Sequence, residues 1–103
     1  MKICVIGAGR WGINHIRTLN EIGALECIVD SNKKQLNKFE KIYPDIKLFD
    51  NLKMALELDI DGFVISTPAN THIQIAKKII NIGKPILIEK PLALSLKEAQ
   101  DLN

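Results

Sequence analysis

The 103-residue sequence has few of the features that mark disulfide-rich, nucleic-acid-binding or membrane-spanning proteins. Its two cysteines form no C-x-x-C pair, and its only arginines, Arg10 and Arg17, make no basic patch of the kind that a nucleic-acid surface needs. The formal net charge is +2, and no apolar run approaches the length of a membrane span. These features predict a protein with neither a nucleic-acid partner nor a membrane segment.

A secretory signal is also lacking, because the apolar amino terminus leads directly into a predicted strand. We therefore expect a cytoplasmic protein. Cys4 and Cys27 both fall within predicted strands, which favours small apolar core residues in a reducing compartment. A disulfide or redox pair is the alternative, since the two strands are predicted to be neighbours. No spacing of His, Cys, Asp and Glu predicts a metal site.

The sequence does contain a regular alternation of two patterns. Short apolar runs predict strands at residues 2–6, 24–29, 47–49, 62–66 and 85–88. Segments of helical periodicity lie between them, the first over residues 11–22, and a capping box at residues 95–98 predicts a last helix. This alternation predicts an α/β fold, a doubly wound parallel sheet of the Rossmann type. The expected strand order is 3-2-1-4-5, with helices on both faces.

Polar residues at the starts of the inner helices are candidate N-caps. Asn32 or Ser31 would cap the second helix, and Asn51 or Asp50 the third. The fourth would open at residue 70 or 71.

Three glycines follow the first predicted strand in the spacing G-x-G-x-x-G, and a helix follows them. Gly7 lets the chain turn sharply out of the strand, and Gly9 lets a pyrophosphate approach the backbone. Gly12 lets the helix pack close to the strand. The helix N-terminus offers free N–H groups to the phosphates. This arrangement predicts a dinucleotide-binding turn.

Asp30 ends the second predicted strand 18 positions after Gly12, where an acid accepts hydrogen bonds from the adenosine ribose of NAD. A carboxylate there repels a 2′-phosphate, so NAD is the expected cofactor and NADP is less favoured. A helix-capping aspartate is the alternative. Arg10, Lys33 or Lys34 would relax the preference by pairing with a 2′-phosphate, or they are ordinary solvated charges.

Trp11, the only tryptophan, lies within the glycine motif. Two interpretations fit it equally: its ring lies beside the nicotinamide half of the cofactor, or it packs against the turn and fixes it. We include Arg10 and Trp11 among the candidate cofactor contacts.

Two further loops are predicted at the carboxyl edge of the sheet, where ligands of such folds bind. After the fourth strand, Thr67, Pro68 and His72 are candidate cofactor contacts, with an ordinary helix-start loop as the alternative. After the fifth strand, Lys90 is the candidate catalytic residue, since a lysine there can stabilise negative charge on a substrate oxygen during hydride removal. Glu89 would orient it and contact the cofactor. A plain surface turn is the alternative.

Three motifs occur in one order: G-A-G-R-W-G, then S-T-P-A-N-T-H, then I-E-K-P-L-A. With them the sequence resembles the amino-terminal domain of the Gfo/Idh/MocA oxidoreductases over essentially its whole length. The resemblance implies that the glycine motif and Asp30 bind a nicotinamide dinucleotide. It also implies that Thr67 and Pro68 line this cofactor and that Lys90 faces the substrate. Ala69 departs from the Asn that many members carry there.

Members of this family carry a second, carboxy-terminal domain that holds the substrate and forms the oligomer interface. The sequence supplies neither a sixth strand nor such a domain, so we expect residues 1–103 to be one cofactor-binding domain without turnover of its own. The resemblance implies an NAD(P)-dependent dehydrogenase of a sugar, sugar-nucleotide or polyol hydroxyl, acting as a homo-oligomer. The turn G-R-W-G-x-N-H-I-R is similar to that of members acting on UDP-N-acetylglucosamine. A free-standing NAD(H) sensor and a methyl transferase using S-adenosylmethionine are the alternatives.

Overall fold

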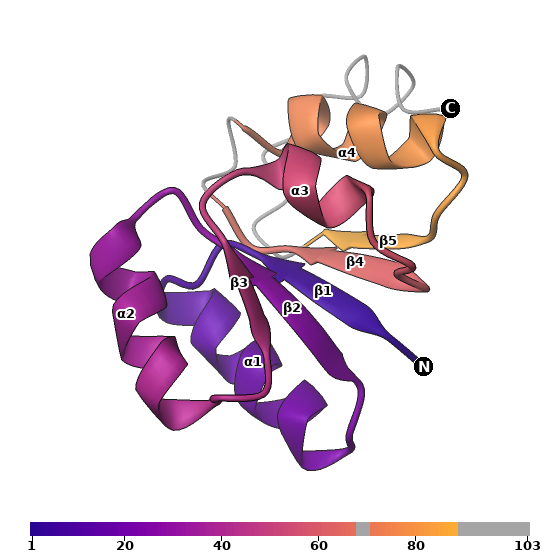
Figure 1. Cartoon of the computed structure of the whole chain (residues 1–103). Helices are drawn as coiled ribbons and strands as arrows, with labels where there is room; N and C mark the ends of the chain where they lie inside the picture. Colours follow the sequence, from indigo (N-terminus) through magenta and orange to yellow (C-terminus); the bar gives the residue numbers. More distant parts are fainter. Residues whose placement is uncertain (68–70, 89–103) are drawn as a thin grey trace.

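The computed structural model describes residues 1–67 and 71–88 of the chain (Figure 1). Its five parallel strands are β1 (Ile3–Ile6), β2 (Leu25–Val29), β3 (Lys47–Phe49), β4 (Gly62–Ile65) and β5 (Ile86–Ile88). They form one sheet in the order β3-β2-β1-β4-β5, which confirms the predicted topology. Each predicted strand is present, with ends that differ from the prediction by one residue at most.

Within the described residues, four helices cover the two faces of this sheet. They are α1 (Arg10–Glu21), α2 (Lys33–Ile42), α3 (Leu52–Leu56) and α4 (His72–Asn81). Figure 1 shows α1 and α2 on one face and α3 and α4 on the other. The helix predicted at residues 95–98 lies outside the described residues.

Two apolar cores hold the three layers together, one on each face of the sheet. Because successive side chains of a strand point to opposite faces, Val5 of β1 packs into the core with Ile16 of α1, whereas Cys4 packs into the core with Ile79 of α4. All four of these side chains are fully buried. Strands covered on both faces are apolar along their whole length, which is why the apolar runs located them correctly.

The two cysteines are free thiols at the centre of the sheet. Cys4 and Cys27 are partners in the register of β1 and β2, and both are fully buried. A hydrogen bond with the Cys27 thiol, together with burial, holds the pKa of Cys4 well above its usual range. Both are therefore core residues, as the apolar interpretation predicted.

Short polar caps start the helices that follow β2 and β3. The Asn32 side chain accepts hydrogen bonds from the backbone N–H of Lys34 and Gln35, at 2.9 and 3.4 Å, and so caps α2. Asn51 caps α3 by accepting from Met54 N at 3.1 Å. Both caps were predicted, and they stand at the carboxyl edge of the sheet.

Candidate functional site

The glycine turn is shaped by how closely neighbouring backbone approaches it. Gly7 has φ +96°, a conformation that residues with a Cβ rarely adopt, and a Cβ there would lie 2.8 Å from Ser66 C and from Thr67 N. A Cβ on Gly12 would lie 1.9 Å from Gly7 O. Gly7 and Gly12 are thus required by the fold itself, since they let β1, β4 and α1 meet.

Gly9 differs from its two neighbours in the motif. It is the N-cap of α1, with extended backbone, and a Cβ placed on it would meet no atom of the described residues within 4 Å. The described part of the chain therefore leaves the space over Gly9 open at a helix N-terminus, where backbone N–H groups and the helix dipole favour an anion. This open space fits the pyrophosphate of a dinucleotide.

Asp30 follows β2 and is fixed by two backbone hydrogen bonds. Its Oδ2 accepts from Ala8 N and its Oδ1 accepts from Asn32 N, each at 2.8 Å. The first bond ties the carboxylate to the glycine turn, and the second ties it to the start of α2. A carboxylate has about four acceptor positions, so two remain for ribose hydroxyls. The capping role that was the alternative for Asp30 belongs to Asn32.

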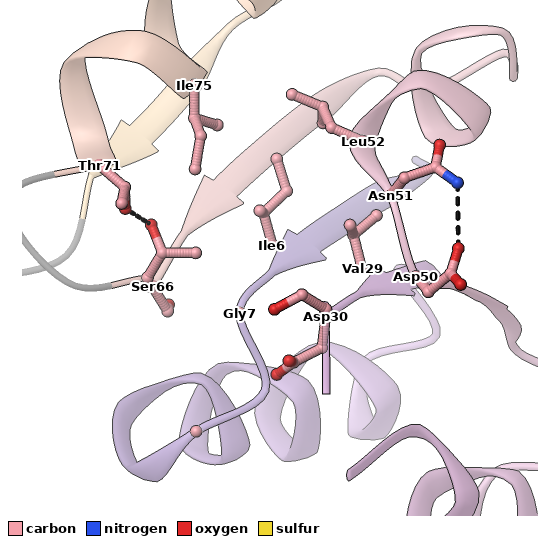
Figure 2. A pocket seen from close by; sticks show the side chains of 13 residues that line it. Ile6, Gly7, Val29, Asp30, Asp50, Asn51, Leu52, Ser66, Thr71 and Ile75 are labelled. Atoms are coloured by element: carbon pink, nitrogen blue, oxygen red, sulfur yellow. Dashed lines mark hydrogen bonds between the residues drawn. The ribbon is translucent and has the colours of Figure 1, made fainter. Parts of the chain in front are cut away.

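A cavity of about 530 Å³ lies over the carboxyl ends of β1, β2 and β4 (Figure 2). Ile6 and Val29 lie at its centre, and Asp30 lies beside the glycine turn. Figure 2 shows Thr71 and Ile75 on one side and Asn51 and Leu52 on the opposite side. The remaining lining residues are Gly7, Gly9, Ser31, Asp50, Ser66 and Thr67. The cavity thus joins Gly7, Gly9, Asp30 and Thr67, four of the predicted contacts.

Asp50 and Leu52 line this cavity, although neither was predicted to contact a ligand. They belong to the segment between β3 and α3. Asp30 N donates to Phe49 O at 3.0 Å, which holds the ends of β2 and β3 together and places Asp50 beside Asp30. The available signal was the strand order, because strand 3 next to strand 2 puts their following residues at one edge.

Charged groups are few at this end of the cavity. Lys33 Nζ lies 4.0 Å from Asp50 Oδ2, and both side chains are well exposed to solvent. Asn51 Nδ2 donates to Asp50 Oδ1 at 3.0 Å. An exposed pair at this distance contributes little to stability.

His72 holds the loop after β4 and does not line the cavity. Its Nε2 lies 2.6 Å from the Thr67 carbonyl oxygen, and its side chain is 2% exposed. Thr71 Oγ1 donates to Thr67 Oγ1 at 2.7 Å. This differs from the predicted ligand contact of His72, because the ring is covered and its Nε2 is already bonded.

Several predicted residues fall outside what the structure describes. Pro68, Glu89 and Lys90 lie outside the described residues, and so does the assignment of Lys90 as catalytic. Helix α1 begins at Arg10, one residue earlier than predicted, but the side chains of Arg10 and Trp11 are likewise outside the description. Their proposed contacts with the cofactor stay predictions.

The described residues, 1–67 and 71–88, have neither a metal-binding cluster nor a helix suited to crossing a membrane. They contain no group of three or more His, Cys, Asp and Glu side chains placed to hold a metal ion. None of the helices within these ranges is both long enough and apolar enough to cross a membrane.

Comparison with known proteins agrees with this geometry. Residues 1–103 match the family model described as an oxidoreductase family with an NAD-binding Rossmann fold, named for Gfo, Idh and MocA. The scyllo-inositol 2-dehydrogenase (NAD(+)) of Bacillus subtilis is 34% identical over 104 residues, covering 97% of this chain and 30% of that protein.

Two solved structures superpose closely on the chain, each over 99% of its length. GenD2 from gentamicin A biosynthesis, solved with NAD, has a TM-score of 0.90 at 30% identity, and 30% of it is covered. UDP-N-acetylglucosamine 3-dehydrogenase GnnA from Acidithiobacillus ferrooxidans has a TM-score of 0.88 at 29% identity, and 32% of it is covered. The chain spans about a third of the length of the relatives it matches. The match over the whole chain, together with the glycine turn and Asp30, shows that it belongs to the Gfo/Idh/MocA oxidoreductase family and forms that family's NAD-binding Rossmann fold.

Proposed function

We propose that the cavity holds NAD(H) for an oxidoreductase that removes hydride from a hydroxyl of a polyol, sugar or sugar nucleotide. The observation that carries the proposal is the Asp30 carboxylate, which is held by Ala8 N and Asn32 N beside the open space over Gly9. A ribose-binding acid and a phosphate-sized gap at a helix N-terminus are what a dinucleotide requires.

Each part of the cavity has its own role in this proposal. The Asp30 carboxylate accepts hydrogen bonds from the ribose hydroxyls. The N-terminus of α1 supplies N–H groups to the phosphates beside Gly9. Asp50 and Leu52 border the adenosine end, whereas Ser66 and Thr67 border the other end. When bound, the nicotinamide supplies the hydride acceptor.

The substrate is proposed from the relatives alone. The relatives described above are named as dehydrogenases of an inositol and of a UDP-sugar. Both names denote oxidation of a ring hydroxyl, so the whole enzyme is proposed to act on a hydroxyl of this class. Lys90 is the residue we propose to contact the substrate oxygen, as the E-K-P motif implies.

Gly9→Ala is the variant that tests this site most directly. Its methyl group meets no atom of residues 1–67 and 71–88 within 4 Å beyond its chain neighbours, and its backbone φ of −79° suits alanine, so the fold should persist. The methyl would instead occupy the proposed phosphate position. We expect NADH to bind the unmodified protein, and Gly9→Ala to bind it at least about 30-fold more weakly, roughly the loss of one or two charge-assisted hydrogen bonds.

The measurement is a fluorescence titration with NADH, with thermal unfolding as the control for folding. Unchanged NADH affinity in Gly9→Ala would remove the phosphates from this turn. Absence of NADH binding by the unmodified, cooperatively folded protein would refute the proposed function.

A further inference from the structure

We propose that His72 is a positioning residue of this cavity, which fixes the Ser66–Thr67 wall against the glycine turn through its bond to the Thr67 carbonyl. The proposal rests on the proposed function, because it explains how one wall of the NAD(H) cavity keeps its place. It assigns to a fully covered side chain an effect on cofactor affinity that does not involve contact with the cofactor.

The hydrogen bond is short and its direction is fixed by chemistry. A carbonyl oxygen only accepts, so His72 Nε2 carries the proton that is donated to Thr67 O across 2.6 Å. The Nδ1 atom is buried and has no partner among the described residues. Burying an imidazole with only one of its two nitrogens hydrogen-bonded costs free energy. The bond from Nε2 to the Thr67 carbonyl is the interaction in the structure that accounts for a histidine at this position.

Thr67 transmits this bond to the cavity, because it is held from three directions. On one side the backbone of the glycine turn approaches it closely, since a Cβ added to Gly7 would lie 2.8 Å from Thr67 N. On another side Thr71 Oγ1 donates to its hydroxyl at 2.7 Å. His72 completes the set by holding the carbonyl from α4. The Thr67 peptide is therefore clamped between the glycine turn and the first turn of α4.

The residues held by these hydrogen bonds also line the cavity. Ser66, Thr67 and Thr71 line the cavity, and Ser66 N donates to Ile6 O at 2.7 Å, which ties this wall to the end of β1. His72 is covered beneath them. Removing its donor would leave the Thr67 carbonyl unpaired and let the wall move away from the turn.

Three variants separate the donor from simple packing. His72→Leu keeps apolar bulk and removes the donor, whereas His72→Gln carries an amide N–H that reaches the place of Nε2. Ile79→Val is the matched control, because Ile79 is fully buried on the same helix and its truncation destabilises the protein without removing a hydrogen-bond donor.

NADH affinity is measured by fluorescence titration at a temperature where every variant is folded by circular dichroism. We expect roughly tenfold weaker binding for His72→Leu, and binding within about threefold of the unmodified protein for His72→Gln and Ile79→Val. If His72→Leu does not fold, His72→Asn replaces it, since its shorter amide does not reach Thr67.

Amide hydrogen exchange at Ser66 gives a second readout that needs no cofactor. Exchange at Ser66 should accelerate in His72→Leu beyond the change caused by global stability, and should not do so in Ile79→Val or His72→Gln. Unchanged affinity and unchanged Ser66 exchange in His72→Leu would overturn the proposal. So would a His72→Gln variant as weak as His72→Leu, which would assign the effect to ring packing. If the unmodified protein binds no NADH, the proposed function fails, while Ser66 exchange still decides the role of His72.

Discussion

The two sides of the cavity are built by different means. On the side of β2 and α1, backbone geometry dominates: Gly7 and Gly12 allow close approach, and Asp30 is held by two backbone N–H groups. On the side of β4 and α4, side chains hold one another, through the bonds that Thr71 and His72 make to Thr67. Substitutions at Gly7 and Gly12 should therefore act sterically, whereas those at Asp30 and His72 should act through the loss of hydrogen bonds.

Gly12→Ala should have the largest effect and should act on the fold. Its Cβ would lie 1.9 Å from Gly7 O, a backbone atom that cannot move without displacing the end of β1. The helix propensity of alanine offsets about 1 kcal/mol of the resulting strain. We expect a net loss of about 2 kcal/mol or more in the free energy of unfolding.

Chemical denaturation measures this loss, with Gly9→Ala as the matched control. The same chemical change at Gly9 meets open space and should leave the denaturation midpoint nearly unchanged. If both variants unfolded at the same denaturant concentration, the tight contact between α1 and the turn would not be a requirement of the fold.

Asp30→Asn should have the second-largest effect. It should lower both the free energy of unfolding and the preference for NADH over NADPH. An asparagine presents one acceptor oxygen, so it cannot accept from both Ala8 N and Asn32 N as the carboxylate does. One backbone N–H then loses its partner, which costs about 1–3 kcal/mol. We expect roughly tenfold weaker NADH binding and a smaller preference for NADH over NADPH, since the charge that repels a 2′-phosphate is gone.

Titrations with NADH and NADPH give the two dissociation constants, and Asp45→Asn serves as the control. Asp45 is an exposed carboxylate just before β3, at the opposite edge of the sheet. Asp45→Asn therefore makes the same chemical change at a site away from the cavity. An unchanged ratio of the two constants in Asp30→Asn would separate Asp30 from the choice of cofactor.

The sequence indicated the glycine turn and Asp30 more directly than the other residues that line the cavity, for a physical reason. The glycine turn and Asp30 act through local backbone geometry, so a spacing along the chain identifies them. Asp50 and Leu52 reach the cavity because β3 lies beside β2, which depends on the assembled sheet. His72 looked available to a ligand because burial of a polar side chain at a helix start depends on tertiary packing that the spacing does not encode.

Asp50→Asn should have the smallest effect of these variants. It tests the end of the cavity that is proposed to hold the adenosine. The bond from Asp30 N to Phe49 O places Asp50 beside Asp30, at strands about 5 Å apart, so two carboxylates border this end of the cavity. The Asp50 side chain is 47% exposed, and solvent therefore screens its charge. Neutralising it also releases Lys33 from its weak pairing at 4.0 Å.

Both changes favour binding of a 2′-phosphate. The preference for NADH over NADPH should therefore fall about threefold at low ionic strength. This effect corresponds to one charge acting across roughly 10 Å of solvent-rich medium. At about 0.15 M salt the Debye length is about 8 Å, and the effect should shrink toward the scatter of the titration. The Asp45→Asn control should show no such change at either salt concentration. A preference that falls equally at both ionic strengths would point to a direct contact of Asp50 with the cofactor, because screening weakens a distant charge but not a hydrogen bond made within the cavity.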